Sequence, residues 1–243
     1  MLKNLVILNF LFIVLAAYIP VSGQAINGNG NIVKREQAVG DIVSITLKSS
    51  SDIILVAPSN NKIIIEADEK FMPFIECVVT DGDLIVRNKN EAWFNLTSPI
   101  KIYVPATRTL TEIVNNGSGN ITTDNSFIYD HNSLKIRSKG SGRVVLNLKC
   151  NNLIINKSGS SRITLKGLAT KVEIDAEGSG NILATDLSAE TIDVKLRGSG
   201  NARLRCTASV HADIRGSSSL YVAGNPQIIQ AKNSSNRIYH IKK

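Results

Sequence analysis

The chain has 243 residues, three cysteines, three histidines and a formal net charge of +8 at neutral pH. An odd number of cysteines leaves at least one thiol free or paired between chains, and the lack of a CxxC pair or Cys/His cluster argues against a zinc site. After the first 23 residues no stretch approaches ~18 consecutive apolar residues, which argues against a membrane-spanning helix in the rest of the chain.

Residues 1–23 have the pattern of a signal peptide. Lys3 supplies a positive charge, the run from Leu5 to Ile19 is almost wholly apolar, and small residues lead to Gly23. This run is short for a membrane span and lies at the amino terminus, as export signals do. We expect cleavage after Gly23, no lipid anchor because no cysteine follows, and a mature protein in the periplasm, at the outer membrane or outside the cell.

Residues 24–110 are predicted to form an amino-terminal β region without a fixed repeat. Turn residues separate short segments with strand character. Most of the larger aromatic residues of the mature chain lie in this half, which fits a wider core or a lid over one end of the structure. The predicted strands are Asp41–Lys48, Asp52–Ala57, Lys62–Ala67, Phe74–Thr80, Asp83–Asn88 and Lys101–Val104.

Residues 111–243 contain a repeat built on the tripeptide Gly-Ser-Gly or Gly-Ser-Ser. Six copies follow one another at spacings of 23, 19, 19, 20 and 18 residues. Such regular self-similarity is the sequence signature of a stacked repeat architecture. The copies begin at Gly117, Gly140, Gly159, Gly178, Gly198 and Gly216.

Apolar residues alternate with polar ones on both sides of each copy. This period of two predicts a strand before and a strand after each turn, and a looser second corner would close a coil of about 19 residues. We therefore predict an all-β fold, a β-helix or β-solenoid, which the amino-terminal region continues or caps. Stacking the coils in register places Ile136, Ile155, Ile174 and Val194 in one interior column.

The corners themselves carry two further expectations. Glycine suits a corner that needs a positive φ. The Asn or Arg after each turn is expected to have a solvated side chain, with a hydrogen-bonded stack as the alternative.

The charge of the mature chain is unevenly distributed, with −4 on residues 24–133 and +11 on residues 134–243. Such asymmetry suggests an anionic partner such as an acidic glycan or another envelope polymer, although solubility alone is the simpler explanation. We do not expect nucleic acid, because no aromatic residues interleave the basic ones. The candidate anion-binding strip is Lys135, Arg137, Lys139, Arg143, Arg162, Lys195, Arg197, Arg203, Arg205 and Arg215.

Three acidic residues, Glu173, Asp175 and Glu177, alternate along one predicted strand and face outward. Such a row could bind Ca²⁺ or cleave a polysaccharide. The next coils place Lys195 and Arg197 beside these acids, so charge ladders on a solvated face explain them better. The Gly-rich turns lack the spacing and helix of a phosphate-binding loop, and we predict no catalytic residues, metal or cofactor.

The cysteines test the predicted register. Cys150 and Cys206 fall at similar positions three coils apart, roughly 14 Å along the axis at ~4.8 Å per coil. A disulfide needs Cα atoms within about 7 Å. We therefore predict that these two residues are unpaired, inward-facing thiols.

The order of several short motifs resembles a known family. Gly28-Asn-Gly-Asn-Ile opens the mature chain, Leu84-Ile-Val-Arg and Ile100-Lys-Ile-Tyr-Val-Pro105 follow, and Leu110-Thr-Glu-Ile leads into the repeats. Together they resemble the head GIN domain family, described as putative auto-transporter adhesins of Gram-negative bacteria. The resemblance covers nearly all of the mature chain, although two of the six turns have Ser in place of the second Gly.

This resemblance implies a β-helical fold of the wider pectin-lyase-like group without that group's catalytic residues. It also implies a role in adhesion or envelope interaction. The leading hypothesis is a non-enzymatic exported scaffold that binds a glycan or another partner. The alternatives are a β-helix polysaccharide lyase or hydrolase and a purely structural homo-oligomer.

Overall fold

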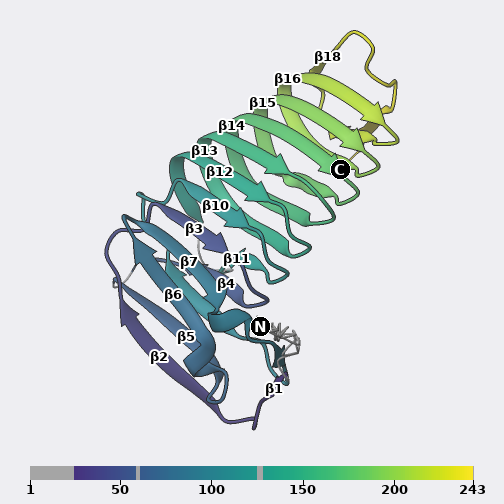
Figure 1. The fold of residues 1–243 in the computed structure, drawn as a ribbon. Helices are drawn as coiled ribbons and strands as arrows, with labels where there is room; N and C mark the ends of the chain where they lie inside the picture. Colours follow the sequence, from purple (N-terminus) through teal and green to yellow (C-terminus); the bar gives the residue numbers. More distant parts are fainter. Residues whose placement is uncertain (1–24, 59–60, 125–127, 243) are drawn as a thin grey trace, which may run out of the picture.

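The computed structural model describes residues 25–58, 61–124 and 128–242. The predicted signal peptide lies outside these residues. Figure 1 shows an elongated stack of β coils that ends, on the amino-terminal side, in a group of separate shorter strands. The hydrophobic core runs continuously through both parts.

The carboxy-terminal half is the predicted solenoid. Its strands pair in parallel, each with the strand of the preceding coil. In the four longest strands, the two strands predicted for a coil join into one that bends at the second corner. The glycine turns interrupt the ladder between coils, and the register also shifts within some coils. The strands are β12 (Tyr129–Ser138), β13 (Arg143–Lys157), β14 (Arg162–Gly178), β15 (Ile182–Gly198), β16 (Ala202–Gly216), β17 (Leu220–Ala223), β18 (Gln227–Gln230) and β19 (Ile238–Ile241).

The predicted interior column is confirmed. Ile136 pairs with Ile155, Ile155 with Ile174, and Ile174 with Val194, and none of these side chains is more than 3% exposed. Each such aliphatic side chain contributes roughly 1.5–3 kcal/mol on burial before entropy is counted. The stacked columns therefore supply the main driving force for folding.

The amino-terminal region continues the same stack, but not in chain order. Strands β3 (Ser44–Leu47) and β4 (Asp52–Val56) lie directly beneath β10 (Glu112–Asn115) and β11 (Ile121–Thr123). Beneath them lie β7 (Asp83–Asn88) and β9 (Lys101–Pro105). The coil formed by β3 and β4 turns at Ser49-Ser-Ser51, where the later coils use Gly-Ser-Gly.

Antiparallel strands cap this end of the stack. Strand β5 (Lys62–Asp68) pairs with β9 and with β2 (Ile32–Ala38), and β6 (Ile75–Thr80) pairs with β7. A two-residue pair, β1 (Ile26–Asn27) with β8 (Phe94–Asn95), and two short 3₁₀ turns at Met72–Phe74 and Lys89–Glu91 complete the region. The sequence predicted β3 to β7 and β9 to within a few residues, but it missed β2, whose alternation consists largely of polar and charged residues.

The loop between β1 and β2 wraps around one buried carboxylate. Asp68 accepts hydrogen bonds from the backbone N–H groups of Asn29 (2.8 Å), Gly30 (2.6 Å) and Lys70 (2.9 Å). Burial raises the pKa of the Asp68 carboxyl, but the three N–H donors more than offset this, and the pKa lies below its ordinary value. The Gly-Asn-Gly-Asn segment therefore satisfies the buried Asp68 carboxylate with its backbone N–H groups.

Glycine is required at the corners mainly because successive coils approach closely there, and less because of the backbone angle φ. A positive φ occurs at the first glycine of four corners but not at Gly117 or Gly140, so that expectation was wrong for these two. A Cβ on Gly140 would lie 1.9 Å from the carbonyl oxygen of Gly117 in the coil below. The four corner glycines with a positive φ are Gly159, Gly178, Gly198 and Gly216.

The position after each turn holds a partial hydrogen-bonded stack rather than only solvated side chains. The Oδ1 of Asn181 accepts from the backbone N–H of Asn201 (2.9 Å), and the Oδ1 of Asn201 accepts from that of Ser219 (3.0 Å). Asn120 makes the same contact to Arg143 (3.2 Å). Each asparagine thus links its coil to the next.

Replacing Gly180 by alanine tests the stacking constraint. A Cβ there would lie 1.9 Å from the carbonyl oxygen of Ser161, so Gly180→Ala must push two coils apart. We expect the free energy of unfolding to fall by more than about 2 kcal/mol in urea titrations. Gly40→Ala, where a Cβ meets nothing within 4 Å, is the matched control and should change stability by less than about 1 kcal/mol. Equal effects of the two changes would contradict the constraint.

Candidate functional site

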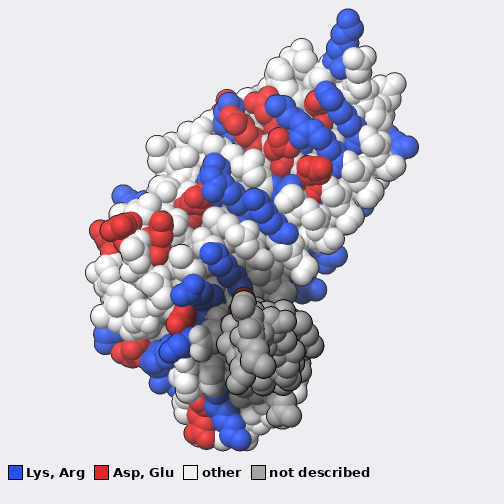
Figure 2. Space-filling model, in the orientation of Figure 1, with Lys and Arg blue, Asp and Glu red and all other residues white. Residues whose placement is uncertain are grey.

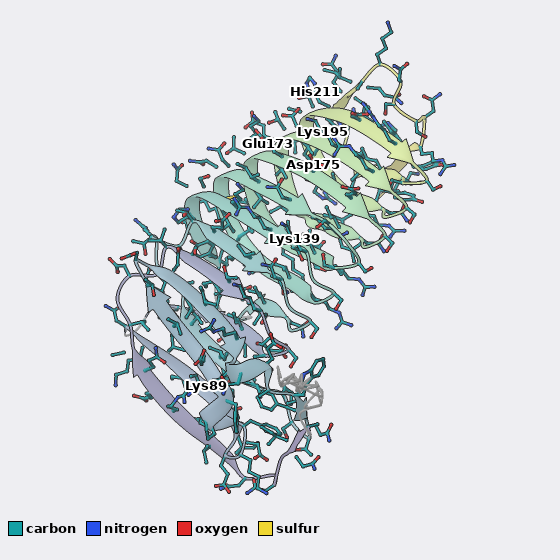
Figure 3. All side chains as sticks on the ribbon, viewed as in Figure 1. Lys89, Lys139, Glu173, Asp175, Lys195 and His211 are labelled. Atoms are coloured by element: carbon teal, nitrogen blue, oxygen red, sulfur yellow. The ribbon has the colours of Figure 1, made fainter. Side chains whose placement is uncertain are left out.

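The predicted basic strip is divided between two faces of the solenoid. The front face is formed by the outward side chains of β12 and of the second halves of β13 to β16, up to the next glycine corner. The rear face is formed by the outward side chains of the first halves of these coils, which follow the glycine corners. Figure 3 labels Lys139, Glu173, Asp175, Lys195 and His211 on the front of the coils. The front face holds Lys135, Arg137, Lys139, Lys195, Arg197 and Arg215, and the rear face holds Arg143, Arg162, Arg203 and Arg205.

Acidic neighbours engage half of the basic residues on the front face. Arg137 pairs with Glu112 at 3.1 Å, and Arg197 pairs with Asp175 at 2.7 Å. Arg215 pairs with Asp213 on its own strand at 3.1 Å. Figure 2 accordingly shows positive and negative side chains intermixed over the upper coils.

The acidic row lies where the sequence placed it, with a change of partners. Asp175 is in register with Lys195, and Glu177 with Arg197, as predicted. The ion pair of Arg197, however, is diagonal, because its guanidinium reaches Asp175. Glu173 pairs with Lys171 at 2.6 Å. These charges are 40–50% exposed, so each pair contributes under about 1 kcal/mol.

The acidic row does not form a metal centre. Over residues 25–58, 61–124 and 128–242, no group of three or more His, Cys, Asp or Glu side chains is placed to hold a metal ion. The depression beside Asp175 and Lys195 encloses about 220 Å³. Isoleucine and asparagine side chains of the neighbouring coils line it together with these charges.

The rear face carries a contact between basic and aromatic residues that the sequence analysis missed. The guanidinium of Arg203 lies 4.8 Å from the ring centre of Tyr221, and Tyr221 stacks on Tyr239 at 5.2 Å. The three residues occupy one position in successive coils. Their spacing of 18 residues was the available signal, because equal spacing in a solenoid means direct stacking.

Two arginines stack on the rear face without an acidic neighbour in register. Arg143 pairs directly with Arg162. Like charges placed opposite each other in a sheet repel, which favours an anion beside them. This pair is the part of the predicted strip with the most unbalanced positive charge.

A large groove lies elsewhere, beside the amino-terminal coils. It encloses about 970 Å³ between the segment Lys89–Leu96 and the corners at Ser49-Ser50 and Gly117-Ser118. Trp93 is 73% exposed and forms part of the wall. An exposed tryptophan in a groove is uncommon unless something binds to it.

The groove combines an aromatic surface with polar and charged groups. Lys48, Lys89 and Arg87 contribute positive charge, and Arg87 is held by Glu76 at 2.8 Å. The Oδ1 of Asn88 is buried and has no hydrogen-bond partner within the described protein, whereas its Nδ2 donates to the carbonyl of Ala92 at 2.8 Å.

The loop that carries Trp93 is firmly anchored. Phe94 packs its ring 4.8 Å from that of the fully buried Phe71, and the backbone N–H of Ile26 donates to the carbonyl of Trp93 at 2.8 Å. Asn90 and Glu91 both adopt a positive φ, at 52° and 53°. Strained non-glycine residues of this kind concentrate at binding sites. Trp93, like the other large aromatic residues of this half, was expected in a wider core or in a lid, and its exposure rules out the core.

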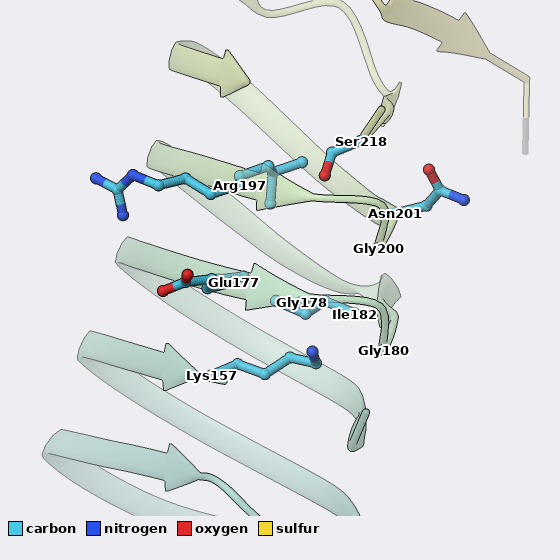
Figure 4. Close-up of a pocket in the computed structure, with 11 residues that line it drawn as sticks. Lys157, Glu177, Gly178, Gly180, Ile182, Arg197, Gly200, Asn201 and Ser218 are labelled. Carbon is cyan, nitrogen blue, oxygen red and sulfur yellow. The ribbon is translucent and has the colours of Figure 1, made fainter. Parts of the chain in front are cut away.

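An internal cavity lies next to a buried lysine at the glycine corner. Lys157 is 3% exposed and points into the interior, where its Nζ donates to the carbonyl of Gly159 at 3.0 Å. Figure 4 shows it below Gly180, Gly200 and Ser218, which line the cavity. The space holds about one water molecule, so it is no ligand site.

The cysteines offer no nucleophile. All three thiols are free and buried, and Cys150 and Cys206 lie three coils apart as predicted. Burial raises the pKa of the Cys77 thiol to about 12 and that of Cys150 to about 11. Both therefore stay protonated at neutral pH.

Comparison with known proteins gives a family and several similar folds. The family model described as "Putative auto-transporter adhesin, head GIN domain" matches residues 41–226. No curated protein matches the chain.

Three solved structures are similar to most of this chain. A putative adhesin from Bacteroides fragilis is 22% identical, with a TM-score of 0.77 over 90% of this chain and 97% of that one. A putative lipid binding protein from Parabacteroides distasonis is 20% identical, with a TM-score of 0.69 over 90% and 100%. A putative adhesin from Parabacteroides merdae is 20% identical, with a TM-score of 0.67 over 90% and 97%. At these identities the likeness concerns the fold.

The buried lysine predicts a pH dependence of stability. Burial lowers the pKa of Lys157 below its ordinary value of 10.5, so the unfolded chain binds more protons between the folded-state pKa and 10.5. The free energy of unfolding therefore rises with pH across that window, and this gain is lost as pH falls through it. Lys157→Met removes this dependence on pH.

Urea unfolding at pH 7 and pH 10.5 measures this effect. Lys157→Met should be more stable than the wild type at pH 7, and its advantage should shrink at pH 10.5. The exposed Lys149→Met is the control and should follow the wild type at both pH values. An advantage of Lys157→Met that does not change with pH would contradict the assignment.

Proposed function

Because the chain belongs to the head GIN domain family of putative auto-transporter adhesins, we propose that it is an exported, non-enzymatic binding scaffold of the Gram-negative cell envelope. Its ligand is a glycan, with an acidic polymer as the favoured class. The proposal includes the signal peptide at residues 1–23, on which export depends. No helix among the described residues is long and apolar enough to cross a membrane.

The groove beside Trp93 is the observation that carries this function. A sugar ring presents a face of C–H groups that packs on an indole ring, and its hydroxyls need donors and acceptors close by. Trp93 offers the ring, and Lys48, Arg87 and Lys89 place positive charge in a lining that also contains Glu76 and Glu91. A volume of about 970 Å³ is sufficient for a short oligosaccharide.

The basic residues outside the groove are proposed as a secondary surface. Lys135, Lys139 and Lys195 on the front face have no acidic partner within 4 Å in the described structure, and Arg143 with Arg162 adds charge on the rear face. A polymer held in the groove could follow these charges along the stack. This contribution weakens as salt rises, because exposed charges are screened.

A non-enzymatic role is supported by the state of the polar groups. The acidic row that could have served as a catalytic pair is tied into ion pairs with Lys171 and Arg197. The cysteine thiols are buried and protonated. A rigid scaffold that presents one binding groove accounts for these features better than a lyase or hydrolase.

Replacing Trp93 tests the proposal. The mature chain is applied to a glycan array, and the affinity for the best ligand is then measured by calorimetry at 0.05 M and 0.5 M salt. Trp93→Ala should lose at least about 10-fold in affinity at both salt concentrations, since aromatic anchors of this kind contribute roughly 2 kcal/mol or more. Trp93→Phe should retain part of the binding.

Leu168→Ala is the matched control, because Leu168 is also an exposed large apolar side chain, at 55%, and lies outside the groove. It should bind as the wild type does. Unchanged binding by Trp93→Ala, or no binding of the wild type to any glycan, would rule out the groove as a glycan site.

A further inference from the structure

The carboxy-terminal end of the solenoid is a step, not a flat surface. Strand β17 pairs with the first half of β16 and β18 with the second half, so these two strands lie at the same level on the rear and front faces. Strand β19 then pairs with β17 and adds one further level on the rear face only. Within the described residues β18 pairs only with β16 and β19 only with β17. The loop between β18 and β19 arches at this end of the stack (Figure 1) and bonds to β16 through the backbone N–H groups of Ala231 and Ser235.

Each free edge belongs to a short strand of four residues that has no charged residue or proline within it. Strand β18 reads Gln-Ile-Ile-Gln and β19 reads Ile-Tyr-His-Ile, so neither contains Lys, Arg, Asp, Glu or Pro. Ile229 is 40% exposed and Tyr239 is 47% exposed, one on each edge strand. Edges without charged residues or proline pair readily with another strand.

The opposite end of the stack is protected. Its outermost strand on the rear side is β2, which carries Lys34, Arg35 and Glu36. Lys34 pairs with Glu66 at 3.3 Å and Lys62 with Glu36 at 2.9 Å, so charges lie along this edge. Head-to-tail stacking into a filament would place a free carboxy-terminal edge against this charged edge and is therefore disfavoured. A closed dimer through the two carboxy-terminal ends is favoured.

We propose that two copies of this chain join through these steps about a two-fold axis that runs parallel to the strands. Such an axis exchanges front and rear faces, so β19 of each copy fills the empty level above β18 of the other. The strands on the two faces run in opposite directions, and the paired β18 and β19 are therefore antiparallel. The overhang of one copy thus fits the recess of its partner on both faces.

The other perpendicular two-fold axis does not give this fit. It would bring β19 against β19. Two strand levels, at ~4.8 Å each, would then stay empty between the two β18 strands. Only the face-exchanging axis pairs every free edge at this end.

The side chains at the step match the proposed pairing. Ile229 and Tyr239 both point outward and become cross-strand neighbours, a pairing of β-branched and aromatic side chains that stabilises antiparallel sheets. The half-buried Ile228 and Ile238 pack against the core of their own copy and become covered, so the two cores join. Lys232, Arg237 and Lys242 bring like charges near the joint, so the dimer should strengthen as salt rises.

Cysteine pairs in separate copies test this geometry directly. Ile229→Cys and Tyr239→Cys are prepared as two proteins and oxidised separately and as a mixture. A disulfide-linked dimer is expected in the mixture and in neither protein alone, because β18 of one copy faces β19 of the other. The three native thiols are buried and do not interfere. Cross-linking of either protein alone, or none in the mixture, overturns the proposal.

Sedimentation of the mature chain at 0.15 M and 0.5 M salt provides the second readout. The wild type should be a dimer whose dissociation constant is at least 10-fold lower at the higher salt concentration. Ile229→Lys should be a monomer, and Leu168→Lys, at an exposed apolar position outside the step, should remain a dimer. A monomeric wild type, or a dimer that Ile229→Lys leaves intact, overturns the proposal. The result is independent of the glycan groove.

Discussion

The fold depends on how closely successive backbones approach one another at the glycine corners. A Cβ at Gly140, Gly142 or Gly180 would lie 1.9 Å from a carbonyl oxygen of the coil below. This contact fixes the height and register of each coil, and the register aligns the interior columns of aliphatic side chains. Burial of those columns supplies the free energy, but the corners determine which residues meet.

The same constraint explains what could be predicted from the sequence. Equal spacing of the glycine turns and a strict period of two were sufficient for the solenoid, the column from Ile136 to Val194 and the separation of Cys150 from Cys206. The first coils were not recognisable, because β3 and β4 turn at three serines and lie in the stack between strands that are distant in sequence. Non-sequential stacking leaves no periodic signal.

The candidate site was predicted less well, for a physical reason. Composition identifies basic residues but not their ion pairs, so Arg137 and Arg215 were counted as free charges although each has an acidic neighbour. Arg197 was expected beside Glu177, but it pairs with Asp175. A turn also reverses the face, which separated the rear-face residues Arg143, Arg162, Arg203 and Arg205 from the front-face part of the strip. Trp93 was missed because a tryptophan in a β region is more often buried, and only the three-dimensional structure shows a groove there.

A register set by close backbone contact implies that neighbouring coils are coupled through the core and that distant coils are not. A double-mutant cycle on the interior column measures this directly. Ile155→Val with Ile174→Val, in adjacent coils, should show a coupling free energy of about 0.5–1 kcal/mol, and Ile155→Val with Val194→Ala, two coils apart, less than about 0.3 kcal/mol. Equal coupling for both pairs, or none for the adjacent pair, would contradict the account.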